Sequence, residues 1–427
     1  MKIALLGYDV ENASAYQYLK LKYPDARFTI YDQRENPARE IPDGVEFVGG
    51  LKDFQGIEAD ISVRTPGVAL SKVQVSGELT TATKLFFDKC PAPIIGVTGT
   101  KGKGTTCTLI YEILKAAGKK VFLVGNIGTP ALDIIDQVTP DSIVVYELSS
   151  FQLWDLDKSP HIAVLLMIDS EHLDVHADLK DYIKAKSNII AHQTSNDIAI
   201  YYNDNETSRL IGESAPGKKV PFTALVSEGN ITIEGKVVAH SIRDVKLVGK
   251  HNLQNVYAAI TAAWHYTQDT EIIASVLRNF TGLPHRLTFV SQVGDVQYYD
   301  DSISTTPAST IAALKSFHQP KVVILGGRSK GADFSELAHY LTTDNVKAIL
   351  VGGEADNLQA SLQQAGFSNF ENLGSDTDMQ AIVKRASELV ESGGVVLLSP
   401  ACSSIGMFKN YADRGDKFIS AVKSLTQ

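Results

Sequence analysis

A glycine-rich stretch that joins an apolar run to an amphipathic segment constrains this chain more than any other feature. Residues 94–106 read IIGVTGTKGKGTT and contain four glycines. The apolar residues at the start predict a buried strand, and the apolar spacing over Thr106–Ala117 predicts a helix. A strand, a glycine-rich turn and a helix gather backbone N–H groups around a phosphate chain at a helix N-terminus. We therefore interpret this stretch as a phosphate-binding loop.

The spacing of this loop departs from the strict Walker A pattern. Five residues separate Gly96 from Gly102, where the strict pattern has four, and Gly104 follows Lys103 where Ser or Thr is usual. Lys103 is expected to reach the β- and γ-phosphates of a nucleotide. The hydroxyls that could hold Mg²⁺ come one and two places late, at residues 105 and 106. A flexible glycine turn, the alternative interpretation, would need no lysines.

Composition excludes several classes of protein. The 427 residues are 44% apolar and 21% charged, which is typical of a globular protein with several domains. The net charge of -9 argues against a nucleic-acid binder. Neither a membrane span nor a signal peptide is expected, because no apolar run approaches 18 residues and MKIALLG is too short for a signal-peptide core. The three scattered cysteines fit a reducing cytosol and neither a disulfide framework nor a zinc site. We expect a cytoplasmic protein.

The N-terminal region begins like a doubly wound α/β unit. Strands are predicted at Lys2–Leu6 and Phe28–Tyr31, with a helix between them, and the second strand is followed by Asp32 and Arg34. The turn GYDVEN offers one glycine where a dinucleotide fingerprint needs three. Asp32 and Arg34 either contact a ribose or uracil, or simply end a strand.

Three further apolar runs after the phosphate loop each end in polar residues. They are Val121–Val124 before Asn126, Ile143–Tyr146 before Glu147, and Ala163–Ile168 before His172. Ligands of open α/β sheets bind outside the carboxyl ends of the strands, so we expect these side chains to share one crevice with Lys103. Asp197–Tyr201 and Asn230–Val238 are interpreted as an added β-rich stretch.

Several side chains near this crevice have two interpretations. Glu147 is placed like the carboxylate that helps to hold Mg²⁺ beside a phosphate loop, or it is a capping glutamate. His172 and His176 lie four residues apart, as in a zinc site, but we interpret His176 as part of a polar loop. By pattern alone, Lys186 is a solvent-exposed helix lysine.

A third α/β unit follows Gly282. Its predicted strands are Val296–Tyr299, Val322–Leu325, Ala348–Val351 and Val395–Leu398. The sequence thus predicts an α/β protein of three domains, at residues 1–92, 93–282 and 283–427. The first and last are expected to be Rossmann-like, and the central one to resemble a P-loop ATPase with a mostly parallel sheet.

Six segments together resemble one family. They are ELSSFQL at 147–153, GNIGTPAL at 125–132, GKHNLQN at 249–255, GLPHR at 282–286, GGRSKGADF at 326–334 and SPACSSIGMFKNYADRG at 399–415. With them the chain resembles the Mur ligases, three-domain ATP-dependent enzymes that form amide bonds in peptidoglycan synthesis. The resemblance implies a UDP-sugar-binding first domain, an ATP-binding second domain and an amino-acid-binding third domain.

The resemblance also implies roles for residues at matching positions. ATP would be held by Gly99, Thr100, Lys101, Gly102, Lys103, Gly104, Thr105, Thr106, Asn252, Asn255, Arg286 and Asp301. One Mg²⁺ would lie with Thr105 or Thr106 and Glu147, and a second with His172 and a carbamylated Lys186. Lys103, His172 and Lys186 would be the catalytic residues. The UDP-sugar substrate would meet Asp32, Arg34 and Asn126, and the incoming amino acid would meet Thr305, Lys330, Ser404 and Tyr411.

ELSSFQL and SPACSS point to the activity that adds D-glutamate to UDP-N-acetylmuramoyl-L-alanine through an acyl phosphate. Three departures leave alternatives open: GKGTT in the phosphate loop, Ile303 where many relatives carry lysine, and GYDVEN without a glycine-rich uridine loop. One alternative is a related Mur- or folylpolyglutamate-type ligase with another acceptor or amino acid. Another is a non-catalytic nucleotide-binding regulator. We expect a monomer without nucleic-acid partners.

Overall fold

The computed structural model describes residues 1–37, 39–126, 128–169, 176–240, 243–247, 251–328, 332–404 and 406–425. The chain folds into two compact units. The first contains Met1–Val245 and Lys250–Asn279, and the second contains Lys246–Gly249 and Phe280–Gln427. Each unit is an α/β structure built on mostly parallel sheets, as the sequence predicts. No described helix is long and apolar enough to cross a membrane.

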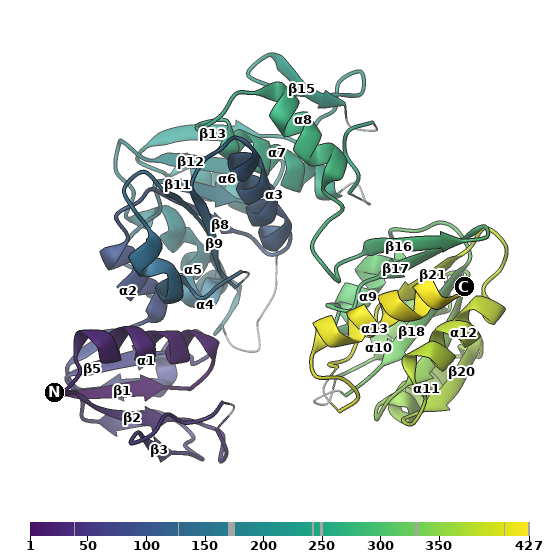
Figure 1. Cartoon of the computed structure of the whole chain (residues 1–427), viewed down its shortest axis with the longest axis horizontal. Helices are drawn as coiled ribbons and strands as arrows, with labels where there is room; N and C mark the ends of the chain where they lie inside the picture. Colours follow the sequence, from purple (N-terminus) through teal and green to yellow (C-terminus); the bar gives the residue numbers. More distant parts are fainter. Residues whose placement is uncertain are drawn as a thin grey trace. The chain divides into compact units, whose positions relative to one another are not determined.

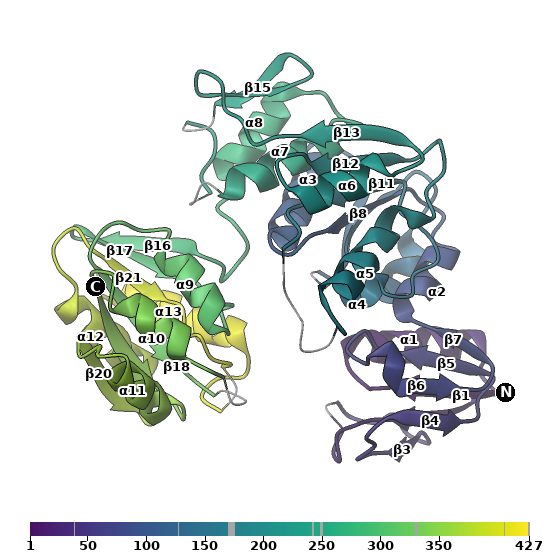
Figure 2. The same ribbon diagram turned by 180° about the vertical axis from the view of Figure 1, so that it is seen from behind.

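The first unit opens with a five-stranded parallel sheet in the order β3-β2-β1-β5-β7 (Figure 1). Its elements are β1 (Lys2–Leu6), α1 (Val10–Lys22), β2 (Arg27–Tyr31), β3 (Glu46–Val48), β5 (Ile61–Arg64), β7 (Glu78–Thr80) and α2 (Ala82–Lys89). The short pair β4 (Phe54–Ile57) and β6 (Val73–Val75) is seen in Figure 2. Because β2 and β5 pair with opposite edges of β1, the strand order reverses between β1 and β5, which is where ligands bind in such sheets.

A six-stranded parallel sheet in the order β13-β12-β11-β8-β10-β9 forms the centre of the same unit. Its strands are β8 (Ile94–Thr98), β9 (Val121–Gly125), β10 (Ile143–Glu147), β11 (Ile162–Leu165), β12 (Ile198–Tyr202) and β13 (Lys218–Phe222). The helices are α3 (Lys103–Ala116), α4 (Ser150–Leu153), α5 (Leu179–Ala191), α6 (Glu206–Glu213), α7 (His251–Ala263) and α8 (Thr270–Asn279), with a 3₁₀ segment over Ala131–Gln137. Every residue of β8 and β10 is buried, as expected for strands covered on both faces.

The predicted β-rich addition is only partly correct. Ile198–Tyr202 is not part of an addition, because it pairs with β11 inside the central sheet. Only β14 (Asn230–Ile233) and β15 (Lys236–His240) form a separate antiparallel hairpin, which turns at Glu234 and Gly235. The local pattern identified the strand but could not identify its partner, since the pairing joins segments far apart in the chain.

One apolar core joins the two sheets of the first unit. It runs from Ile3 and Val63 in the N-terminal sheet, through Ile135 of the 3₁₀ segment, to Val144 and Tyr146 in β10. The N-terminal and central sheets are therefore packed as one body.

The second unit holds a sheet in the order β16-β17-β21-β18-β19-β20, with only β16 antiparallel to its neighbour. Its elements are β16 (Thr288–Val293), β17 (Val296–Asp300), α9 (Pro307–Leu314), β18 (Lys321–Gly326), α10 (Ser335–Leu341), β19 (Val346–Val351), α11 (Ala355–Gln364), β20 (Phe370–Gly374), α12 (Met379–Leu389), β21 (Val395–Leu398) and α13 (Tyr411–Ser424). Helices α9, α10 and α11 share one apolar core with the sheet, and α12 and α13 share another. The sheet is thus covered on both faces.

Candidate active site

The glycine-rich stretch forms the turn between β8 and α3. The helix starts at Lys103, three residues earlier than the apolar spacing predicts, because Gly102 takes a left-handed φ of +88° and turns the chain directly into the helix. A Cβ atom on Gly102 would lie 2.1 Å from Oδ1 of Asn255. Glycine is therefore required here on both conformational and steric grounds. The first N–H groups of α3 lack partners within the helix, which suits them to bind an anion.

Two lysines converge on one carbonyl oxygen of this turn. Nζ of Lys103 donates to the carbonyl oxygens of Gly99 at 3.1 Å and Thr100 at 3.0 Å. Nζ of Lys186, from α5, donates to the same Gly99 oxygen at 2.8 Å. Lys186 is 1% exposed, so its interpretation as a solvent-exposed lysine is wrong. It shares a helix face with buried Tyr182 and Ile189, a spacing that could have revealed its burial.

Glu147 ends β10, the strand beside β8, and is buried. Its carboxylate acts on the buried thiol of Cys107 in α3, whose pKa is raised by burial first and by Glu147 second, while Lys103 opposes the shift. The charges of Glu147 and Lys103 thus both act on the pKa of this one thiol, near the start of α3.

The two threonines of the loop differ in their surroundings. Both Thr105 and Thr106 are buried. Oγ1 of Thr106 is buried without a hydrogen-bond partner among the residues that the structure describes. A buried hydroxyl without a partner is uncommon and calls for an explanation, such as a bound ion.

The loop is also tied to the end of β11 and to α5. Oγ1 of Thr100 donates to the carbonyl oxygen of Asp169 at 2.9 Å and lies 3.0 Å from the hydroxyl of Tyr182. Tyr182 in turn stacks its ring under the ammonium group of Lys186, 4.7 Å from the ring centre. The carboxyl edge of the sheet therefore gathers the loop, Glu147 and α5, as expected from the strand ends. His172 lies outside the described residues.

His176 lies in the polar loop before α5, as predicted, and its side chain is buried there. Its Nδ1 lies 3.0 Å from Oδ2 of Asp181 and its Nε2 lies 3.0 Å from Oγ of Ser150. The ring stacks on Phe151 and packs against Trp154. Both ring nitrogens have protein partners, which leaves neither of them for zinc.

Two asparagines of α7 lie at the phosphate loop. Nδ2 of Asn255 donates to Oδ1 of Asn252 at 2.8 Å, and Asn255 closely approaches Gly102. Helices α3 and α7 lie side by side in both views, which explains this approach (Figures 1 and 2).

At the end of β2, Asp32 and Arg34 bind each other. Arg34 donates from Nε and Nη2 to the two carboxylate oxygens, at 2.9 and 2.6 Å, and the backbone N–H of Tyr8 donates to Oδ2 at 2.9 Å. Burial alone would raise the pKa of Asp32, but these hydrogen bonds outweigh it and lower the pKa.

Asn126 directly follows β9 in the central sheet. It donates its backbone N–H to the carbonyl oxygen of Glu147 at 3.4 Å.

In the second unit, GLPHR is docked on the end of β17. Nδ1 of His285 lies 2.6 Å from Oδ2 of Asp300, and the backbone N–H of Leu287 donates to Oδ1 of Asp301 at 3.1 Å. Burial raises the pKa of Asp301 to about 6. Arg286, between the two anchored residues, is exposed.

The remaining predicted residues of this unit lie near the same strand ends. Ser404 is buried, whereas Thr305 and Tyr411 are exposed. The Tyr411 ring meets that of His285 edge to face, with centres 6.2 Å apart. Lys330 lies outside the described residues.

Arg414 is a central residue of this site that sequence reasoning missed. It is buried, and its guanidinium donates to Oγ and the carbonyl oxygen of Ser302, at 2.9 and 2.8 Å, and to the carbonyl oxygen of Cys402 at 3.1 Å. It thus connects the segments after β17 and β21. Burial lowers its pKa to about 10. An arginine within a polar segment carries no sequence signal for burial.

Two family models match the chain. The Mur ligase middle domain matches residues 97–263, and the model described as "Mur ligase, glutamate ligase domain" matches residues 285–402. A curated relative, the UDP-N-acetylmuramoylalanine--D-glutamate ligase of Clostridium botulinum strain 657, is 34% identical over 99% of this chain and 97% of its own length.

Solved structures share the fold at lower identity. The UDP-N-acetylmuramate-alanine ligase MurC of Thermotoga maritima aligns over 100% of both chains with a TM-score of 0.60 and 19% identity. The MurF ligase of T. maritima, in complex with ADP, aligns over 86% of this chain and 90% of its own with a TM-score of 0.57 and 20% identity. These two likenesses concern the fold alone.

Proposed function

The chain belongs to the Mur ligase family of ATP-dependent, amide-forming enzymes, and we propose that it joins D-glutamate to UDP-N-acetylmuramoyl-L-alanine. The observation that carries this proposal is the end-to-end relationship to a protein named for that reaction. The fold alone would not identify the amino acid that is added, because a UDP-N-acetylmuramate-alanine ligase has the same fold.

ATP is proposed to bind at the phosphate loop, with its phosphates on residues 99–106. The N–H groups at the start of α3 and the ammonium group of Lys103 provide the positive charge that phosphates need. Asn252 and Asn255 are proposed to contact ATP, and the approach of Asn255 to Gly102 in the loop supports this. Arg286 and Asp301 are also proposed to contact ATP.

Mg²⁺ fits the residues at the loop. Thr106 offers a buried hydroxyl without a described partner, and Glu147 offers a carboxylate at the neighbouring strand end. The described residues contain no group of three or more His, Cys, Asp and Glu that could hold a metal. The loop with Thr106 and Glu147 suits Mg²⁺, because this ion takes most of its ligands from phosphates and water. When bound, it neutralises charge that develops on the phosphates. A second ion is proposed at His172 and at a carbamate on Lys186, which would supply oxygen ligands.

The two substrates are proposed to bind to different units of the chain. Asp32, Arg34 and Asn126 would meet the UDP-sugar substrate, and Thr305, Lys330, Ser404 and Tyr411 would meet D-glutamate. We propose domains at residues 1–92, 93–282 and 283–427, a monomeric state and a cytoplasmic location.

The proposed reaction has two steps. The substrate's alanyl carboxylate attacks the γ-phosphate, which yields an acyl phosphate and ADP. The amine of D-glutamate then attacks the acyl carbon, and phosphate leaves. Lys103 stabilises negative charge in the first step by its position at the loop.

The test is ADP release by purified protein with Mg²⁺-ATP, UDP-N-acetylmuramoyl-L-alanine and a panel of D- and L-amino acids. Release that depends on D-glutamate, with a product heavier by one glutamyl residue, is the expected result. Turnover with another amino acid would identify the protein as a related ligase that adds that amino acid. A lack of turnover with every amino acid would overturn the proposal, and folate acceptors would be tested next.

A further inference from the structure

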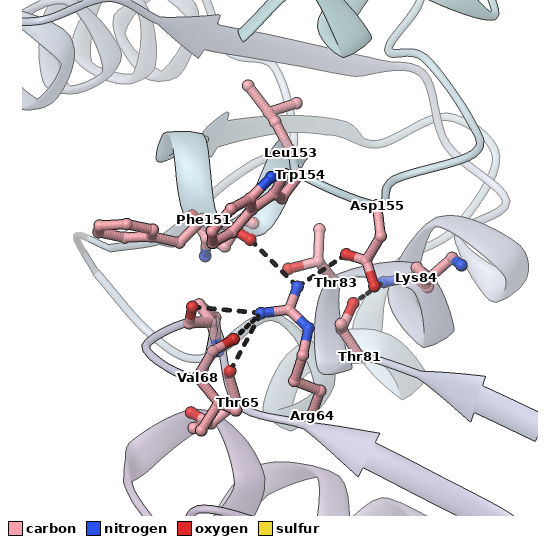
Figure 3. Close-up of polar contacts among 12 residues, drawn as sticks. Arg64, Thr65, Val68, Thr81, Thr83, Lys84, Phe151, Leu153, Trp154 and Asp155 are labelled. Atoms are coloured by element: carbon pink, nitrogen blue, oxygen red, sulfur yellow. Dashed lines mark hydrogen bonds and ion pairs between the residues drawn. The ribbon is translucent and has the colours of Figure 1, made fainter. Parts of the chain in front are cut away.

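A completely buried arginine joins the N-terminal sheet of the first unit to helix α4 beside the central sheet. Arg64 is the last residue of β5, and its side chain is 0% exposed. Nη1 donates to the carbonyl oxygens of Thr65 at 3.3 Å, Pro66 at 3.2 Å and Val68 at 2.8 Å, all in the loop that follows the strand. Nη2 lies on the other side of the guanidinium and reaches Phe151 and Asp155, in the segment that follows β10 (Figure 3).

The contacts of Nη2 are with α4 and the residue after its C-cap. Nη2 donates to the carbonyl oxygen of Phe151 at 3.3 Å and to Oδ1 of Asp155 at 2.8 Å. Helix α4 is only four residues long and begins three residues after Glu147. The side chain of Asn188 in α5 holds the same helix from another direction, through the carbonyl oxygens of Leu153 at 2.8 Å and Trp154 at 3.0 Å. Arg64 therefore contacts a segment that is bonded to the helix of Lys186.

The loop held by Nη1 lies where the strand order of the N-terminal sheet reverses. The N–H of Thr65 donates to the carbonyl oxygen of Leu6 at the end of β1, and its hydroxyl donates to Oδ2 of Asp9 at 2.8 Å. Ligands of doubly wound sheets bind at this point, between the first strand and its out-of-order neighbour. The loop after β5 thus borders the point in the sheet where the UDP-sugar substrate is proposed to bind.

We infer that Arg64 is a positioning residue that holds the loop after β5, at the proposed acceptor site, in register with the segment that follows Glu147. The inference rests on the proposed function. An arginine suits the role because its planar fork donates in two directions at once, which a lysine ammonium on a flexible stem cannot reproduce. Misplacement of a bound substrate by about 1 Å can cost roughly 100-fold in rate. The register set by Arg64 thus governs the distance between acceptor carboxylate and γ-phosphate.

The test compares Arg64→Lys with Arg27→Lys. Arg27 starts β2 of the same sheet and forms an exposed ion pair with Glu46, so it controls for the loss of an arginine. Steady-state constants are measured for ATP, acceptor and D-glutamate. Arg64→Lys is expected to lower kcat/KM for the acceptor by roughly 10- to 100-fold, in part through a higher KM for the acceptor, while KM for ATP and KM for D-glutamate stay within about twofold. A purely structural role would instead reduce the active fraction, which lowers kcat and leaves the KM of every substrate, the acceptor included, unchanged.

Asp155→Asn is the second variant, in case Arg64→Lys folds poorly. It keeps the size of the side chain and removes the charge that faces Nη2. We expect it to lower kcat/KM for the acceptor, as Arg64→Lys does, but by a smaller factor. If the wild-type protein turns over and the Arg64, Asp155 and Arg27 variants have equal steady-state constants for the acceptor, this inference is overturned and the proposed function is not. A wild-type protein without turnover would overturn the proposed function and this inference with it.

Discussion

The ammonium group of Lys186 donates to the carbonyl oxygen of Gly99 at 2.8 Å, and this bond joins the middle of α5 to the phosphate loop. The same oxygen accepts from Lys103. Two cationic side chains from different helices therefore meet at the turn proposed to bind ATP. Glu147, which ends the strand beside β8, brings one negative charge to the same edge of the sheet, and a bound phosphate chain would bring more.

Lys186→Ala is expected to remove turnover, with a loss of roughly 100-fold or more, because charge stabilisation at a buried site is lost. Short carboxylic acids should restore part of the rate by placing a carboxylate where the proposed carbamate would lie. Steady-state ADP release with and without acetate measures both effects. Lys184→Ala is the control, because Lys184 is an exposed residue of the same helix. Full activity of Lys186→Ala would exclude the proposed role.

Thr106→Val is expected to raise the Mg²⁺ concentration needed for half-maximal turnover by roughly tenfold, while the free energy of unfolding changes by less than about 0.5 kcal/mol. Stability is preserved because the hydroxyl of Thr106 has no described partner to lose. The Mg²⁺ dependence of kcat and urea denaturation are the measurements. If Thr105→Val shifts the Mg²⁺ dependence and Thr106→Val does not, the hydroxyl ligand is Thr105.

His176→Ala is expected to lower the free energy of unfolding by about 2–4 kcal/mol, since it removes two buried hydrogen bonds and the stacking on Phe151. The emission of the neighbouring Trp154 reports the transition in urea. His192→Ala, at the C-cap of α5, is the matched control. Equal stability of the two variants would contradict the core role of His176.

Glu11 should make stability depend on pH. Burial raises the pKa of Glu11 to about 7 from its ordinary 4.5, and Asp9 adds to the effect. Between these values the folded state binds the proton more tightly than the unfolded chain does. Its contribution to stability is therefore complete below pH 4.5 and declines as the pH rises to about 7, by at most roughly 3 kcal/mol.

Glu11→Gln should abolish that decline, because the amide keeps the shape and can still accept the bond from Gln152. The free energies of unfolding of wild type and variant are compared at pH 5 and pH 8. Glu78→Gln, at an exposed position, serves as the control. If the free energy of unfolding of Glu11→Gln declines by the same amount as that of wild type, the pH dependence comes from other groups.

Features that depend on neighbours in the chain could be predicted from the sequence. The strand, glycine turn and helix at residues 94–116, the α/β class and the strands that precede Asp32 and Glu147 all follow from local apolar spacing and from glycine at set positions. The apolar pattern places the start of α3 three residues too late, because the turn at Gly102 depends on backbone conformation and not on apolar spacing.

Tertiary structure alone decided which polar side chains are buried and what they bind. By pattern alone Lys186 is interpreted as solvent-exposed and His176 as part of a polar loop, yet both side chains are buried because α5 and the loop before it pack against distant segments. Ile198–Tyr202 pairs with β11 for the same reason. Arg64 and Arg414 each bind carbonyl oxygens from segments far apart in the chain, and no local pattern encodes that arrangement. Local sequence sets the elements through backbone preference and apolar period, whereas the partners of a buried charge are set only when those elements pack.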